Sequence, residues 1–236
     1  MNTPSTTETG PASVRTHHVI FSGGLDSTSL LAKVVDIAAG RGEHVQAVSF
    51  DYGQRHRVEL EHAAQVAEAL GVPHLVLDLS GLMQGSALID PEVEVPLGHY
   101  AAPTMALTVV HGRNMLFAST TVAQAQPGDA VYTGVHNGDH PIYADCRPEF
   151  WGPFAQAVEA AYGVEVLTPF IDGDKAEAVT VGVEHGAPLE LSWSCYNGGL
   201  THCGACGTCV ERREAFELAG VADPTVYKAT DTVPAS

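Results

Sequence analysis

Four cysteines near the C-terminal end of the chain have the spacing of a metal site. They follow a C-x7-C-x2-C-x2-C pattern, as Cys195, Cys203, Cys206 and Cys209. Thiolates two residues apart, with glycines between them, can converge on one ion, and four of them complete a tetrahedral Zn²⁺ site with no position for water. The pattern therefore predicts a closed, structural zinc site. The alternatives are four unrelated buried cysteines or an iron–sulfur cluster, although no Cys-Pro follows the C-x2-C-x2-C run.

A second stretch has the composition of a phosphate-binding loop. The apolar residues Val19 to Phe21 run into Ser-Gly-Gly-Leu-Asp-Ser-Thr (22–28), and a helical pattern follows. Glycines let backbone N–H groups turn inward, and the unpaired N–H groups of a helix N-terminus favour an anion. Neither GxxxxGK[ST] nor GxGxxG is present. The stretch predicts a nucleotide loop of another kind, and the alternative is an ordinary strand-to-helix turn with a Ser/Asp cap.

These groups need a scaffold, and the chain alternates strand and helix patterns that provide one. We expect further strands over 44–50, 74–79, 130–134 and 165–167, and further helices over 60–70, 112–125, 150–162 and 175–185. Such alternation predicts an α/β fold with a doubly wound, mostly parallel sheet of the Rossmann type. Ligands then bind at the carboxyl ends of the strands, where Ser22 and Asp51 both fall.

The domain organisation is predicted from composition. We expect a disordered lead-in over 1–16, an ATP-binding α/β domain over 17–192 and a zinc-binding segment over 193–236. Residues 80–111 are rich in glycine and proline, and they predict either a binding lid or a disordered insertion.

Bulk properties narrow the class of protein. The 236 residues carry a net charge of −17, which disfavours wrapping a nucleic acid. The sequence contains no run of 18 apolar residues, so it does not predict a membrane span. Five cysteines are an odd number, so a metal site in a reducing, cytoplasmic compartment is favoured over a disulfide framework.

The loop at 22–28 resembles the PP-loop of ATP pyrophosphatases, which belong to a HUP-like superfamily and split ATP between its α and β phosphates. Taken together, the motifs resemble the 7-cyano-7-deazaguanine synthase family of the queuosine and archaeosine pathway. The matching stretches are FSGGLDST (21–28), FDYGQRH (50–56), GRNMLF (112–117), YADCRPEF (143–150), DKAEA (174–178), CYNG (195–198) and CGACGTC (203–209).

This resemblance implies a ligase that uses ATP to convert 7-carboxy-7-deazaguanine and ammonia to 7-cyano-7-deazaguanine. Adenylation turns the carboxylate into an acyl-adenylate, ammonia gives the amide, and adenylation of the amide lets AMP leave as the nitrile forms. The resemblance also implies Mg²⁺ and structural Zn²⁺, small-molecule partners without nucleic acid or membrane, and a homodimer.

Site residues follow from the same motifs as expectations. The residues expected to hold ATP are Phe21, Ser22, Gly23, Gly24, Leu25, Asp26, Ser27, Thr28, Asp51, Tyr52, Gly53 and Gln54. Of these, residues 51–54 would lie beside the nucleotide or the base. Asp26 would hold Mg²⁺ or cap the helix. Arg113 and Lys175 would neutralise a phosphate or the substrate carboxylate, or form surface ion pairs. Asn114, Asp145 and Arg147 would contact the deazaguanine, and Asp145 and Arg147 could instead bridge a subunit contact.

Two rival functions remain at the level of sequence. One is another PP-loop adenylating enzyme, such as a tRNA-thiolating enzyme, which needs a sulfur-carrying cysteine and a basic face for RNA. Cys146 is the only cysteine outside the cluster, and the chain is acidic. The other rival is a non-catalytic module that binds ATP and zinc.

Overall fold

A computed structural model describes residues 14–99 and 102–228, so most of the predicted lead-in lies outside the described residues. The centre is a five-stranded sheet with the order β3-β2-β1-β4-β5, in which every pair of neighbours is parallel. The strands are β1 (Thr16–Ile20), β2 (His44–Asp51), β3 (His74–Asp78), β4 (Ala130–Tyr132) and β5 (Glu165–Leu167). The predicted parallel α/β fold is confirmed.

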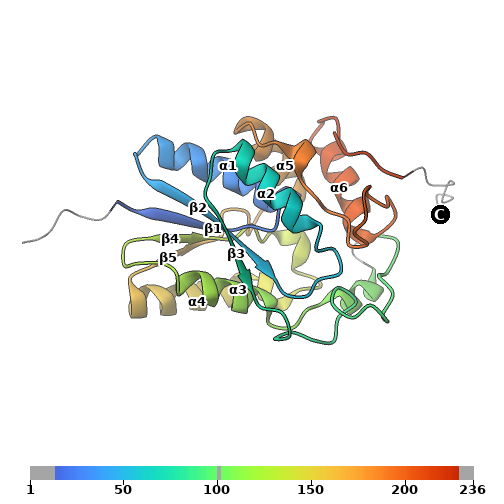
Figure 1. Ribbon diagram of the computed structural model, residues 1–236, viewed down its shortest axis with the longest axis horizontal. Helices are drawn as coiled ribbons and strands as arrows, with labels where there is room; N and C mark the ends of the chain where they lie inside the picture. Colours follow the sequence, from blue (N-terminus) through green and yellow to red (C-terminus); the bar gives the residue numbers. More distant parts are fainter. Residues whose placement is uncertain (1–13, 100–101, 229–236) are drawn as a thin grey trace, which may run out of the picture.

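Helices cover both faces of this sheet (Figure 1). They are α1 (Leu25–Ala39), α2 (Glu59–Ala69), α3 (Arg113–Val122), α4 (Pro148–Tyr162), α5 (Lys175–Glu184) and α6 (Gly207–Leu218). Figure 1 shows α1, α2 and α5 on one face and α3 and α4 on the other. Two apolar clusters follow from this arrangement, one centred on Val19 and Leu31 and the other on Val131 and Trp151. The strands are apolar on both sides because both faces are covered.

Helix α6 is the largest element that the sequence patterns missed. The expected tight turn of the cysteine motif ends at Cys206, which is the N-cap of this helix. Along α6, Arg212, Ala215 and Phe216 are buried, and Phe216 belongs to an apolar cluster with Leu25 and Val179. The sequence analysis interpreted the glycines and cysteines of the motif as a turn. It therefore did not predict this helix, which packs on α5.

Several expected boundaries shift by a few residues. Helix α4 begins at Pro148 rather than at residue 150, because proline suits the first turn of a helix. Strand β4 ends at Tyr132 and helix α3 at Val122, earlier than expected. Within the described ranges, no helix has the length and apolar character that crossing a bilayer requires.

The segment between β3 and α3 is largely irregular, with one 3-10 helix over Pro103–Thr108. Hydrogen bonds connect its described residues to other parts of the protein. Arg55 donates to the carbonyls of Ala87 and Val93 at 3.1 and 2.9 Å. Leu97 forms an isolated antiparallel bridge with Cys206, one residue of the cysteine motif. These contacts favour an ordered wall over a disordered insertion.

Candidate active site

The loop over residues 21–24 joins β1 to α1 and, with the first turn of α1, lies at the carboxyl end of the central strand. Gly23 has a φ of +78°, and a Cβ atom there would lie 2.8 Å from the backbone nitrogen of Ala63 and 2.9 Å from the carbonyl oxygen of Glu59. Only glycine combines this conformation with so close an approach of α2. The Gly23 carbonyl also accepts a hydrogen bond from the Trp193 amide at 2.8 Å.

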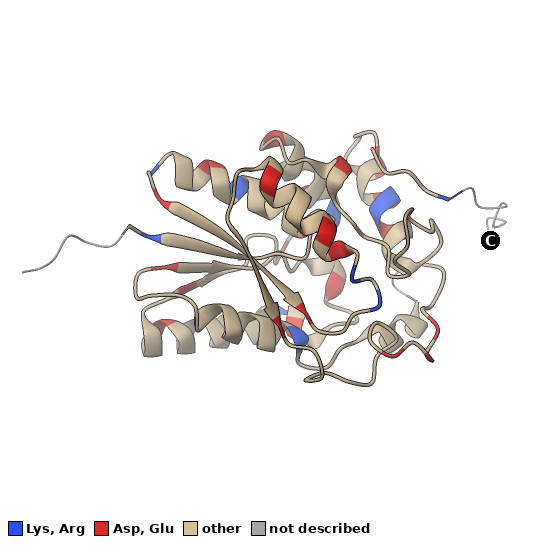
Figure 2. Cartoon of the chain, viewed as in Figure 1, with Lys and Arg blue, Asp and Glu red and all other residues tan. Residues whose placement is uncertain are grey.

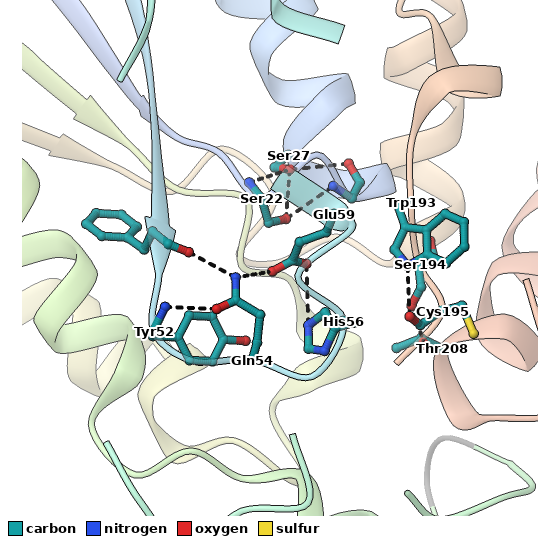
Figure 3. A network of polar contacts seen from close by, with 12 residues as sticks. Ser22, Ser27, Tyr52, Gln54, His56, Glu59, Trp193, Ser194, Cys195 and Thr208 are labelled. Carbon is teal, nitrogen blue, oxygen red and sulfur yellow. Dashed lines mark hydrogen bonds and ion pairs between the residues drawn. The ribbon is translucent and has the colours of Figure 1, made fainter. Parts of the chain in front are cut away.

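The interior of this loop is lined with donors. The Ser22 hydroxyl accepts from the Gly24 amide at 3.2 Å and lies 3.2 Å from the Ser27 hydroxyl (Figure 3). Gly24 is the N-cap of α1 and no side chain caps the helix, so the first amides of α1 are left for a ligand. The positive end of the helix dipole and these amides together make an anion site.

A pocket opens from this loop along the carboxyl ends of the strands. The predicted residues that line it are Phe21, Ser22, Gly24, Leu25, Asp26, Ser27, Tyr52, Arg113, Asn114 and Lys175. The predicted residues that do not line it are Gly23, Thr28, Asp51, Gly53, Gln54, Asp145 and Arg147.

Three residues of the second group are buried or have hydrogen-bond partners outside the pocket lining. Thr28 is fully buried. Asp51 accepts from the Arg57 guanidinium at 2.7 Å and from the Gly53 amide at 3.2 Å. Gln54 accepts from the Tyr52 amide at 2.8 Å and so fixes the turn after β2.

Asp145 and Arg147 lie on the loop before α4. Asp145 accepts from the Asn114 amide at 3.3 Å, beside the start of α3. Arg147 donates to the His140 carbonyl at 2.7 Å and is exposed. Their contacts in the described chain therefore hold neighbouring loops, and Asn114 is the residue of this group that reaches the pocket.

Arg113 is a partly buried cation of the pocket. Burial opposes its charge, but the hydroxyl groups of Tyr52, Tyr143 and Tyr196 surround it and hold its pKa above the ordinary value. Beside it the rings of Phe50 and Phe117 stack with centroids 4.2 Å apart. The result is an aromatic chamber with a single guanidinium among its described lining residues, suited to a flat ligand with an anionic substituent.

Lys175 is a second cation in the pocket lining, and it lies on the side of the loop between β1 and α1. It is the first residue of α5, whose N-cap Asp174 accepts from the Glu177 amide at 2.9 Å. Burial opposes its charge, but Asp26 at 3.4 Å and Glu211, with which it forms a short ion pair, raise the pKa of Lys175. Lys175 is thus fixed beside the first turn of α1.

Several pocket residues escaped the sequence analysis. The chief ones are His56, Glu59, Asp139, Tyr143, Trp193, Ser194, Tyr196 and Thr208, with Glu211 behind them. His56 closes the FDYGQRH motif, so its position there was a usable signal. Glu59 and Glu211 are helix residues with no local pattern to mark them, and only the packing of α2 and α6 brings them to the site.

The four predicted cysteines converge. Their sulfur atoms all lie within 4.8 Å of one another, and three of the four residues are buried. Four sulfurs bound to one zinc at about 2.3 Å would lie about 3.8 Å apart. Cys203 Sγ accepts from the amides of Ala205 and Cys206 at 3.4 and 3.3 Å, as a thiolate ligand would. The cluster can therefore bind a metal ion.

This cluster also supports a wall of the pocket. The Trp193 indole donates to the Cys195 carbonyl at 2.8 Å, and the Thr208 hydroxyl donates to the Ser194 carbonyl at 2.7 Å (Figure 3). Trp193, Ser194 and Thr208 all line the pocket. The cysteine cluster is thus connected by hydrogen bonds to the side of the cavity that Trp193, Ser194 and Thr208 line.

Comparisons with known proteins agree with this geometry. Residues 16–220 match the model of a family described as queuosine biosynthesis protein QueC. The 7-cyano-7-deazaguanine synthase of Allorhizobium ampelinum is 51% identical over 222 residues, which cover 90% of this chain and 92% of the relative. The synthase of Ruegeria pomeroyi is 53% identical over 218 residues, which cover 89% and 93%. Among solved structures, the U34-tRNA thiolase NcsA of Methanococcus maripaludis superposes with a TM-score of 0.49 and 11% identity, over 86% of this chain and 65% of the thiolase.

Proposed function

The chain belongs to the QueC family of queuosine biosynthesis proteins, and on that premise we propose the reaction that its pocket carries out. The resemblance predicted from the motifs is confirmed, and with it the synthase activity that the curated relatives carry in their name. The enzyme converts 7-carboxy-7-deazaguanine and ammonia to 7-cyano-7-deazaguanine. Two rounds of adenylation by ATP, first of the acid and then of the amide, drive the reaction.

ATP is held by the loop between β1 and α1. The uncapped amides of α1 and the hydroxyls of Ser22 and Ser27 bind its phosphates, and this assignment is supported by their position in the pocket wall. Lys175 lies on the same side and neutralises the pyrophosphate that leaves. Preorganised donors of this kind stabilise the charge that develops on a leaving group.

The deazaguanine occupies the aromatic chamber. Arg113 binds the carboxylate and presents it to the α phosphate, which is supported by the position of Arg113 in the pocket wall with Phe117 and Tyr52. Asn114 contacts the base edge. Positioning of two bound reactants in this way accounts for most of the rate enhancement in adenylation.

Two metal ions fit the residues present. Asp26 and Asp139 line the pocket and offer the carboxylate oxygens that Mg²⁺ prefers, and Mg²⁺ would neutralise the phosphates of ATP. The four cysteines fit Zn²⁺ in a closed structural site, since four sulfurs within 4.8 Å of one another leave space for a single ion but not for a multi-iron cluster.

The surroundings of the enzyme are proposed from the resemblance and the cysteine content. We propose a cytoplasmic location, because none of the five cysteines forms a disulfide among the described residues. A homodimer is proposed from the family resemblance alone. Figure 2 marks acidic residues on most visible helices and few basic ones, which supports a small-molecule substrate over RNA. The chain organisation into a lead-in, an α/β domain and a zinc-binding segment also remains a proposal.

The rival tRNA-thiolating activity is not favoured. Cys146, the only cysteine outside the cluster, is buried, and burial raises the pKa of its thiol. A sulfur-carrying cysteine must form a thiolate readily. The non-catalytic alternative is not favoured either, because the curated relatives are named as synthases.

The observation that carries the proposal is that an uncapped helix N-terminus and the partly buried Arg113 line one pocket. Purified enzyme should release pyrophosphate from ATP only when 7-carboxy-7-deazaguanine is present, and mass spectrometry should show the nitrile when ammonium is added. Turnover of ATP that ignores the deazaguanine would contradict the proposal.

A further inference from the structure

Glu59 is a carboxyl group in the pocket wall that the proposed chemistry does not use. It is the first residue of α2, it is 8% exposed, and it lines the same pocket as Arg113 and the phosphate loop. One of its oxygens accepts from the Gln54 amide at 3.0 Å, and the other lies 3.4 Å from His56 Nε2. Figure 3 shows the Glu59 side chain between Ser22 and His56.

His56 adds a second observation. It is 4% exposed and lines the pocket, and its Nδ1 atom has no hydrogen-bond partner among the described residues. A buried ring nitrogen without a partner costs free energy unless a ligand satisfies it. A small molecule that can both donate and accept hydrogen bonds would do so.

The electrostatic setting suits proton transfer near neutral pH. Burial raises the pKa of Glu59 to about 8, against the hydrogen bond from Gln54 and the charge of Arg113 on α3. Burial and the charge of Arg113 lower the pKa of His56 to about 3, so this imidazole is neutral. Tyr52, at the end of β2, is the other titratable group that interacts with Glu59, and burial raises its pKa, so it too is neutral.

The position of Glu59 matches one step of the reaction. Its helix touches the phosphate loop through Gly23, and its carboxyl group lies within the field of Arg113. An acyl group held between Arg113 and the nucleotide would therefore lie in the same cavity as Glu59 and His56.

We propose, on the basis of the function proposed above, that Glu59 and His56 form the ammonia site and that Glu59 is the base of the amide-forming step. The nitrogen lone pair of ammonia forms the C–N bond to the acyl carbon. The C–O bond to the phosphate breaks, and its electron pair leaves on AMP. One proton of the attached nitrogen moves to the Glu59 carboxylate. A base whose pKa lies near the working pH accelerates such a transfer by about 10²–10⁴-fold.

The test separates adenylation from amide formation. Enzyme with ATP and 7-carboxy-7-deazaguanine but no ammonium is allowed to form the acyl-adenylate, and it is then chased with ammonium or with hydroxylamine. Hydroxylamine is largely unprotonated at neutral pH and is a strong nucleophile that needs less help from a base. The E59Q variant should release pyrophosphate at the wild-type rate, lose at least about 100-fold in amide formation, and form the hydroxamate at close to the wild-type rate.

E61Q is the matched control, since Glu61 is an exposed carboxyl group on the same helix, and it should behave as wild type. If E59Q loses the hydroxylamine reaction as fully as the ammonium reaction, Glu59 only shapes the pocket and the inference is wrong. If wild-type enzyme forms no acyl-adenylate, the proposed function fails instead.

A second measurement does not depend on the variant folding. At a fixed concentration of free ammonia, amide formation by the wild-type enzyme should rise with pH through about 8, as Glu59 loses its proton. The hydroxylamine reaction should lack this rise. Equal pH profiles for the two nucleophiles would overturn the inference.

Discussion

The Nζ atom of Lys175 lies 3.4 Å from an Asp26 carboxylate oxygen, so the first turns of α5 and α1 meet beside the phosphate loop. The same ammonium pairs with Glu211 of α6. One cation thus joins three helices whose residues are far apart in the sequence. Its removal would leave the carboxylates of Asp26 and Glu211 facing each other without compensation.

This arrangement predicts the effect of K175M. The variant should lower kcat/KM for ATP by about 100-fold or more, because the charge that opposes the pyrophosphate is lost. K33M is the control, since Lys33 lies on α1 near the Phe170 ring and outside the pocket. Steady-state pyrophosphate release measures both, and equal activity of K175M and K33M would contradict the role of Lys175.

Replacing Arg113 by lysine should weaken the binding of 7-carboxy-7-deazaguanine. R113K keeps a positive charge but loses the planar, forked donors that bind a carboxylate in two places. We expect KM for 7-carboxy-7-deazaguanine to rise by about 10- to 100-fold, with KM for ATP little changed. R41K, at an exposed site, should leave both values as they are. A selective rise in KM for ATP would instead assign Arg113 to the phosphates.

Comparing two glycines with similar backbone conformations distinguishes the cost of backbone strain from the cost of a steric clash with α2. Gly23 and Gly53 have φ values of +78° and +82°, but a Cβ atom would clash with α2 only at Gly23. G53A should cost about 1 kcal/mol of unfolding free energy, from the left-handed backbone alone. G23A should cost about 3 kcal/mol, because the added clash forces α2 to move. Urea denaturation measures both, and equal costs would show that the loop and α2 are not in tight contact.

The metal site offers a matched pair of cysteines. C206S should lose the metal and the cooperative unfolding of the C-terminal part together, since it removes one of four sulfur ligands. C146S should retain both, because Cys146 lies outside the cluster. Elemental analysis of wild-type enzyme should find about one zinc per chain. Iron with sulfide in place of zinc would contradict the assignment.

The raised pKa of Glu59 predicts a pH dependence of stability. Its pKa is about 8 in the folded protein and near the ordinary value of 4.5 in the unfolded chain. Between these values the folded state holds more protons, so the unfolding free energy falls as pH rises through the window. Melting temperature should therefore fall from pH 5 to 9 more steeply in wild type than in E59Q. Parallel curves would show that Glu59 ionises normally.

The sequence predicted the sheet because each strand is an apolar run followed by a helical pattern, and this alternation dictates parallel pairing. Ser22, Asp26, Arg113 and Lys175 line one pocket because their motifs follow strands or open helices. Whether they act as proposed is a separate question, which the variants above address.

The remainder of the site depends on long-range packing. Glu59 and Glu211 sit on helices whose local patterns give no sign of a pocket, and α6 was hidden within a motif that reads as a turn. Asp145 and Arg147 lie in a matching motif, yet their described contacts are with neighbouring loops. Sequence shows which motifs are present, but not which of their side chains turn inward.

The bridge between Leu97 and Cys206 has a consequence for how the enzyme comes apart. The amide of Gly98 also donates to the Ala205 carbonyl at 3.0 Å. Backbone contacts therefore connect the segment between β3 and α3 to the cysteine motif. A chelator that extracts the ion would release this stretch together with α6, and would open the cavity from two directions. Demetallated enzyme should then be cut by a protease in the stretch between β3 and α3 well before the sheet itself unravels.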